Sequence, residues 1–366
     1  MNREFDAPRE ELTCAPLRGV RIVEFEGIGP APLAGRMLVD LGARVTLVAR
    51  PTKSGLPPEM TPSPDGPLLK GKRIVELDLK SRDGVTQALD LVAEADVLVE
   101  GYRPGVMERL GLGPAECANV NARLVYARMT GWGQDGPLSA AAGHDLNYIA
   151  LSGLLSLAAP AGQAPRTPPT VVGDAVGALA MVCGIACALN RAQREGRGSV
   201  VDAAIVDALA MLSPLVLLLR STGEVDGNRP SVFHDSPFYD TYTCADGRHL
   251  SIGAIEPQFY RELLQRVGFH DVDLARQWNR SEWPALKERL RSLFASEPLE
   301  HWNALLEGTD ACYAPVLTLA EAQAHPHNRA RGLFSIANDG EIAVARSLRF
   351  VDLHAANEPV ATSDGQ

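Results

Sequence analysis

The sequence has few aromatic residues and no excess of positive charge. Phe, Trp and Tyr make up 5% of its 366 residues, and the formal net charge is −10. A chain with this balance is not expected to bind nucleic acid or a membrane surface. Any anionic ligand must therefore be held by a local cluster of basic side chains.

Signals for export, membrane insertion and metal binding are also missing. Residues 1–16 mix charges with prolines and lack an apolar h-region, so we expect no secretory signal. The most apolar stretch, 172–190, contains Asp174 and predicts a buried helix rather than a membrane span. Six cysteines occur without a CxxC pair, and Cys183 and Cys187 are expected to be small core residues. This pattern is typical of a reduced, cytoplasmic enzyme without a metal site.

Short apolar runs alternate with helical patterns along the first part of the chain. Strands are predicted over the ranges 20–25, 44–49, 74–79, 97–99 and 123–128. Alternating strands and helices predict an α/β fold with a doubly wound parallel sheet, although the GxGxxG dinucleotide motif is absent.

The later part of the chain changes character. A long helix is predicted over 172–195, and the stretch 221–238, rich in glycine, proline and charge, predicts a linker. A hairpin turning at Asp246-Gly247 follows. Further helices are predicted over 257–267, 281–295 and 298–306.

One stretch, 50–82, is locally basic. It holds seven basic and four acidic residues, a local charge of +3 in an acidic chain. Arginine forks suit phosphate oxygens, so the stretch could hold a phosphorylated ligand. A solvated surface with incidental charge is the interpretation that the sequence alone favours.

His144 is the first candidate for proton transfer. It follows a glycine-rich loop and opens a predicted helix, whose N-terminus would supply backbone donors to an oxyanion. Histidine takes and gives protons near neutral pH. His234 and His270 are also followed by aspartate, so the His-Asp pair alone is not distinctive.

Two acids are further candidates. Asp174 opens an otherwise apolar helix, where it is either a first-turn acid that stabilises the helix or an acid/base tuned by burial. Glu256 precedes Pro257 between a strand and a helix, a position that suits a capping residue equally well.

Taken together, several segments resemble the family of α-methylacyl-CoA racemases and family III CoA-transferases, from about residue 16 to 350. They include PLRGVRIVEFEGIGP, KGKRIVELDLKS, DVLVEGYRPGVMERLGLGP, LVYARMTGWGQDGP, AGHDLNYIALSG, VGDAVGALAMVCGI and YDTYTCADGRHLSIGAIEPQFY. The resemblance implies a large Rossmann-like domain over 16–220, the linker 221–238, a smaller α+β domain over 239–330, and a return to the large domain over 331–366. It also implies an interlocked homodimer, with each active site between the large domain of one subunit and the small domain of the other.

The resemblance further implies roles for particular residues. His144 and Asp174 correspond to the acid/base pair, Glu256 supports the histidine, and backbone N–H groups near Asp145 could hold an enolate oxygen. The coenzyme A contacts that we expect are Arg50, Lys72, Arg73, Arg103, Tyr148 and Tyr239. Ala31 stands where the family usually has glycine, and we expect it to crowd the coenzyme slightly.

The function implied is racemisation of 2-methylacyl-CoA thioesters, by removal and return of the α-proton through an enolate. Coenzyme A is then part of the substrate, and no separate cofactor is needed. One alternative is a family III CoA-transferase with Asp174 as nucleophile, but such enzymes generally lack the histidine of the GHD motif. The other is a non-catalytic protein that binds CoA thioesters.

Overall fold

The protein is described here by a computed structural model, which covers residues 15–51, 66–160, 162–225, 229–336, 342–344 and 348–350. The predictions for residues 1–14, for Lys53 and for the tail 351–366 lie outside these residues. The chain divides into two compact units. Unit 1 contains the described parts of Met1–Leu155, Thr167–Met211 and Gly332–Gln366, and unit 2 those of Ser156–Arg166 and Leu212–Arg331.

Unit 1 is built on a parallel sheet of six strands. The strands are β1 (Arg21–Phe25), β2 (Arg44–Ala49), β3 (Arg73–Glu76), β4 (Val97–Glu100), β5 (Val125–Thr130) and β6 (Ser199–Ala204). Their order is β3-β2-β1-β4-β5-β6, and every pairing is parallel. This is the doubly wound order, so the predicted α/β class is confirmed.

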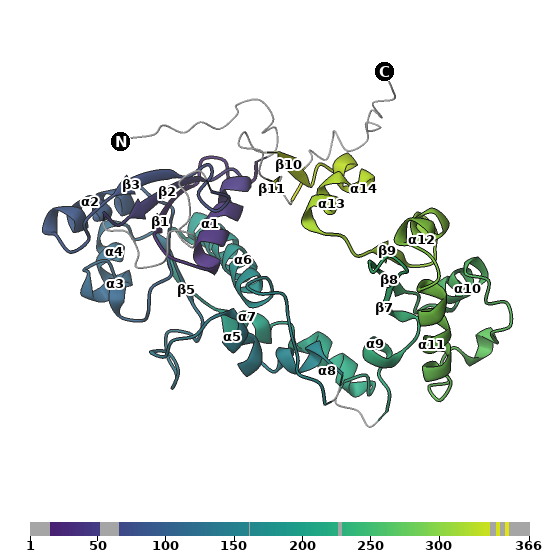
Figure 1. The fold of residues 1–366 in the computed structure, drawn as a ribbon. Helices are drawn as coiled ribbons and strands as arrows, with labels where there is room; N and C mark the ends of the chain where they lie inside the picture. Colours follow the sequence, from purple (N-terminus) through teal and green to yellow (C-terminus); the bar gives the residue numbers. More distant parts are fainter. Residues whose placement is uncertain are drawn as a thin grey trace, which may run out of the picture. The chain divides into compact units, whose positions relative to one another are not determined.

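Helices cover both faces of this sheet, as Figure 1 shows. They are α1 (Pro30–Asp40), α2 (Arg82–Ala93), α3 (Val106–Arg109), α4 (Pro114–Val120), α5 (Asp145–Leu151), α6 (Gly173–Glu195) and α7 (Ile205–Ala210). Successive side chains along a strand point to opposite faces of the sheet, so one strand contributes side chains to two cores. In β4, Val97 and Val99 join the core that contains Met181 of α6. Leu98 joins the other core, with Val92 of α2.

Helix α6 has the length and apolar composition of a membrane-crossing helix, the one such helix among the residues described. Its Met181, Ile185 and Leu189 pack in the core of unit 1. Cys183 and Cys187 lie on its exposed face, so the expectation that they are core residues is wrong for the single chain.

Unit 2 combines a small antiparallel sheet with helices. Its strands are β7 (Tyr239–Thr243), β8 (His249–Gly253) and β9 (Tyr313–Pro315). The predicted hairpin is confirmed, with Gly247 in the left-handed region at φ 77°. The helices are α8 (Ser213–Ser221), α9 (Val232–Asp235), α10 (Pro257–Arg266), α11 (Trp283–Phe294), α12 (Leu299–Leu306), α13 (Leu319–Ala324) and α14 (Pro326–Ala330), with a 3₁₀ turn at Leu274–Arg276. A second 3₁₀ turn, Leu154–Ala158, begins in unit 1 and ends in unit 2. The last strands, β10 (Phe334–Ile336) and β11 (Ile342–Val344), pair with each other and belong to unit 1.

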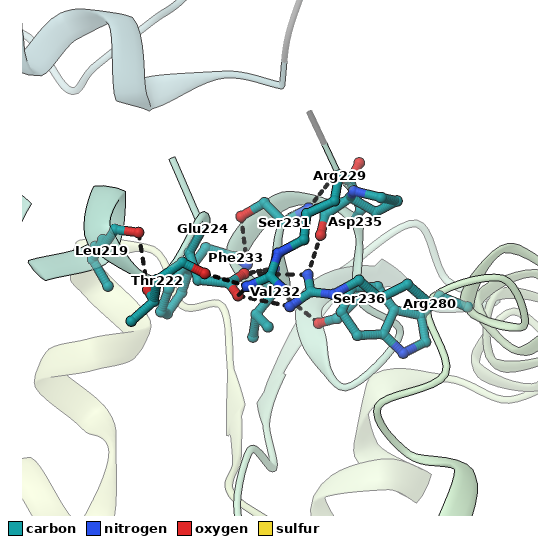
Figure 2. A network of polar contacts seen from close by, with 12 residues as sticks. Leu219, Thr222, Glu224, Arg229, Ser231, Val232, Phe233, Asp235, Ser236 and Arg280 are labelled. Atoms are coloured by element: carbon teal, nitrogen blue, oxygen red, sulfur yellow. Dashed lines mark hydrogen bonds and ion pairs between the residues drawn. The ribbon is translucent and has the colours of Figure 1, made fainter. Parts of the chain in front are cut away.

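The segment 221–238, which was expected to be a linker, is part of unit 2 and is held there by polar contacts. Figure 2 shows Glu224 at the centre of its polar contacts. Its carboxylate lies 2.7 Å from Arg280 Nη2 and 3.0 Å from Arg229 Nη2, and accepts the N–H of Val232 at 2.8 Å. Helix α8 also belongs to unit 2, so the observed boundary at 211/212 precedes the one expected at 220.

Candidate active site

The site in unit 1 begins at the loop between β1 and α1. Gly29 ends this loop with φ 74°, and Pro30 starts the helix. A Cβ atom on Gly29 would lie 3.4 Å from Asp174 Oδ2, so the loop lies directly against that carboxylate. From the neighbouring strands β1 and β4 the chain continues toward opposite edges of the sheet. In α/β sheets, ligands bind at the carboxyl ends of the strands at such a switch point.

Asp174 is the second residue of α6, as the predicted helix start requires. Its side chain is half-buried. Burial raises the pKa of Asp174 from 3.8 to about 6; the charge of Asp145 adds to the rise and that of His144 opposes it. A carboxyl group with this pKa exchanges protons close to neutral pH.

His144 and Asp145 lie at the start of α5. His144 is the N-cap residue, and its backbone N–H donates to Oδ1 of Asn147 at 3.0 Å. Its imidazole is exposed. Asp145 is buried, and its Oδ1 accepts the backbone N–H of Asp174 at 2.8 Å. The sequence-based expectation concerned only the backbone of Asp145, so this role of its side chain was missed.

Tyr148 supports the turn that carries His144. Its hydroxyl donates to the carbonyl of Gly143, and its ring meets Trp132 edge-on with centroids 4.6 Å apart. The side chain is 8% exposed. Burial, followed by the charge of Asp174, raises the pKa of Tyr148. Tyr148 thus has a structural role in this turn, and its expected contact with coenzyme A stays a prediction.

The basic residues expected to bind coenzyme A lie in different places. Arg50 follows β2 and Arg103 follows β4; both are exposed, and Arg50 Nε lies 3.2 Å from Glu26. Arg73 begins β3 beside Thr46, before the carboxyl end of β2. Lys72 is completely buried against a glutamate, so its ammonium cannot meet a coenzyme and the expectation for it is corrected.

Ala31 also lies differently from the expectation. Its side chain is 1% exposed and belongs to the core of unit 1. A Cβ atom on Gly101 would lie 3.2 Å from the Ala31 Cβ, so the methyl group of Ala31 packs closely against Gly101. Ala31 therefore does not crowd a ligand on the surface.

Glu256 and Tyr239 belong to unit 2. Glu256 is the exposed N-cap residue of α10, and its side chain makes no capping hydrogen bond. Tyr239 borders an open groove of about 450 Å³, which Gly253 and Cys312 also line. The charge of Glu256 contributes, after burial, to raising the pKa of the Cys312 thiol, so Glu256 lies near this groove. Cys312 has a left-handed backbone, φ 51°, a feature that the sequence did not signal.

Metal ligation finds no support in the described part of the chain, where no group of three or more His, Cys, Asp or Glu side chains could hold a metal ion. The chemistry that these residues can perform is proton transfer, from a histidine and an aspartate on neighbouring helix starts.

The sequence matches CoA-transferase family III over residues 17–363. The chain belongs to this family. It is 42% identical over 328 residues to the alpha-methylacyl-CoA racemase of Mus musculus, covering 89% of this chain and 83% of the mouse protein. Identity to the alpha-methylacyl-CoA racemase of Homo sapiens is 38% over 330 residues, covering 89% and 84% of the two chains.

A crystal structure of a CaiB/BaiF family protein from Brucella suis has the same fold. The TM-score is 0.78 at 25% sequence identity, and the match covers 92% of this chain and 93% of the Brucella protein. The family resemblance expected from the sequence motifs is thus confirmed.

Proposed function

We propose that this member of CoA-transferase family III is an α-methylacyl-CoA racemase, which interconverts the R and S forms of 2-methylacyl-CoA thioesters. The observation that carries the proposal is the pairing of Asp174, with its pKa raised to about 6, and the exposed His144 at the adjoining helix start. The two mammalian relatives named as such racemases support the same activity.

The thioester carbonyl acidifies the hydrogen on the α-carbon. One of the two groups, His144 or Asp174, removes this proton, and a planar enolate forms. The other group then delivers a proton to the opposite face, which inverts the configuration. General acid–base catalysis of this kind contributes about 10²–10⁴-fold to the rate.

The enolate oxygen needs hydrogen-bond donors. The backbone N–H of Asp145, the first residue of α5, is suited to this task because the first N–H groups of a helix have no partner within it. A donor in such a position typically stabilises the transition state by about 3–4 kcal/mol.

Glu256 and Tyr239 enter this proposal through a homodimer, in which the small unit of one subunit completes the site of its partner. Exposed apolar side chains support an interface. Leu215, Leu217 and Leu218 are exposed on α8, which buries none of its residues in the described chain. Exposed apolar side chains that lie together on one helix are typical of a protein contact. Glu256 would then orient and charge-stabilise His144 of the partner subunit.

The proposal includes no metal, redox cofactor or added coenzyme, because proton transfer at a thioester requires none. It also places the enzyme in the cytoplasm, where unpaired cysteines stay reduced. Dialysis against a chelator should leave racemisation unchanged, and a loss restored by one metal ion would contradict this part.

The function is tested by incubating the enzyme with one enantiomer of a 2-methylacyl-CoA in heavy water. Racemisation predicts deuterium at the α-carbon together with scrambled configuration. In a second reaction, an added free carboxylic acid is supplied as acceptor. Formation of its CoA ester without deuterium at the α-carbon would indicate a CoA-transferase with Asp174 as nucleophile. Neither product, with binding retained, would indicate a non-catalytic protein.

A further inference from the structure

Asp145 is a buried acid with an unusual partner. Its side chain is 6% exposed. A buried carboxylate costs free energy unless it is hydrogen-bonded. Its Oδ1 accepts the backbone N–H of Asp174, 29 residues away in the sequence, at 2.8 Å. The bond therefore joins the start of α5 to the start of α6.

The start of α6 needs an acceptor from elsewhere. Its N-cap residue is Val172, whose side chain cannot accept a hydrogen bond. Serine, threonine, asparagine or aspartate normally fill that position because their side-chain oxygens accept an N–H of the first turn. Asp145 supplies this oxygen from a different helix.

The residues around this hydrogen bond are closely packed. A Cβ atom on Gly173 would lie 2.8 Å from Oδ1 of Asp145 and 3.2 Å from the side chain of Ile149. Glycine at 173 thus allows the carboxylate to approach the helix start. Because Asp174 follows directly, its own position depends on this contact.

A cap by itself does not require a charge, because asparagine caps as well as aspartate. Asp145 nevertheless places a second carboxylate beside Asp174. Two neighbouring carboxylates disfavour ionisation of one another. The charge of Asp145 raises the pKa of Asp174 and is the second-largest cause of the rise, smaller than burial.

We infer that Asp145 is a positioning residue that acts through Asp174. Its hydrogen bond fixes the Asp174 backbone at the start of α6, and its negative charge favours the protonated, proton-donating form of Asp174. The inference rests on the proposed role of Asp174 as a proton carrier.

The inferred role follows from what two proton carriers require. One carrier must hold a proton while the other is free to accept one. An aspartate with its ordinary pKa of about 3.9 would be almost fully ionised at pH 7, and would seldom be the donor. The charge of Asp145 helps to raise the pKa of Asp174, so Asp174 can hold the proton that His144 would otherwise hold.

Other charged and titratable groups face Asp174 as well. From α5 these are the imidazole of His144, which acts against Asp145, and the hydroxyl of Tyr148. From the loop after β4, Arg103 acts on the same Tyr148. The loop after β1 contributes Gly29, which has no charge.

The test compares pH profiles of kcat/KM for racemisation. Asp145→Asn keeps an acceptor oxygen and removes the charge, so the acid limb should move to lower pH while the basic limb stays. The thermal midpoint should change little in Asp145→Asn and fall in Asp145→Ala, which loses the acceptor too. Asp135→Asn, an exposed acid in the loop before α5, is the matched control and should leave the acid limb in place.

An unmoved acid limb in a folded Asp145→Asn enzyme would overturn the inference and leave Asp145 as an ordinary cap. Asp145→Ser replaces the asparagine variant if that variant does not fold. As a second measurement, aspartate labelled with ¹³C at the carboxyl carbon reports the titration of Asp174, whose signal is identified by its loss in Asp174→Asn. Its midpoint should move to lower pH without the Asp145 charge, and an unchanged midpoint contradicts the inference.

Failure of the proposed function gives a different result. If Asp174→Asn exchanges the α-proton as fast as the wild type, Asp174 is not a proton carrier. If Asp174→Asn is inactive but Asp145→Asn leaves the acid limb of the pH profile in place, the proposed function stands and the role of Asp145 fails.

Discussion

The ammonium nitrogen of Lys72 lies 2.7 Å from Oε2 of Glu24, and neither side chain exposes any surface. The same nitrogen donates to the carbonyl of Pro32, near the start of α1, at 2.9 Å. Gly35 of α1 lies over the Glu24 carboxylate, where a Cβ atom would not fit. The pair thus joins β1, the start of β3 and the helix that follows the Gly29 loop.

Lys72→Met should destabilise the protein strongly, because it leaves Glu24 buried without its partner. Removing one member of a buried pair costs about 3–5 kcal/mol, measured as the free energy of unfolding in urea. The double variant Lys72→Met with Glu24→Gln should recover part of this loss. Lys80→Met, at an exposed position, is the control. If Lys72→Met and Lys80→Met lowered the free energy of unfolding equally, the buried pair of Lys72 and Glu24 would not be stabilising.

Asp174→Asn should fold and bind CoA thioesters, because the change is nearly isosteric. Its loss should fall on kcat and reach about 10²–10⁴-fold, since the proton carrier is absent. Steady-state kinetics and a direct binding measurement separate the two quantities. If Asp174 only stabilised the helix start, asparagine would serve almost as well and turnover would stay near normal.

Asp174→Asn should also change stability in a pH-dependent way. The pKa of Asp174 is raised in the folded protein from 3.8 to about 6, so the folded state holds its proton more tightly than the unfolded chain. Ionisation of Asp174 therefore destabilises the wild type progressively between these values. The variant should melt above the wild type at pH 7, and the difference should vanish below about pH 4. A constant difference across this range would contradict the shift.

Arg103→Ala should raise KM for acyl-CoA and leave kcat nearly unchanged, if this exposed arginine meets a phosphate of the coenzyme. A hydrogen bond to a charged group contributes about 1.5–3 kcal/mol, equivalent to a rise in KM of about 10–150-fold. Arg123→Ala is the control, because Arg123 is exposed before β5, at the amino end of the strands. A substrate lacking the adenosine phosphates should show no difference between the Arg103 variant and the wild type.

Co-expression tests whether Glu256 serves the partner subunit. His144→Ala and Glu256→Ala should each be nearly inactive as homodimers. A mixed dimer would contain one site with both residues intact and should regain part of the activity. If purified mixed dimers stay inactive while both chains are folded, Glu256 acts within its own subunit or is not required.

Local sequence patterns determined most of the elements. Short apolar runs separated by helical patterns predicted the parallel sheet, because buried strands need apolar side chains on both faces. Pro257 after Glu256 marked a helix start, since proline fits the first helical position. His144 and Asp174 could likewise be placed at helix starts, and the family motifs named them as candidates.

What these residues meet was decided by the tertiary structure. Lys72 lies in a basic stretch, but the sheet brings it to Glu24, 48 residues away, and encloses it. The Asp145 carboxylate and the Asp174 backbone are brought together by two separate helices, and Gly29, in the loop after the first strand, lies against the carboxylate of Asp174. Such contacts depend on strand order and helix packing. Local propensities do not encode these, since each reports only on a residue's neighbours along the chain.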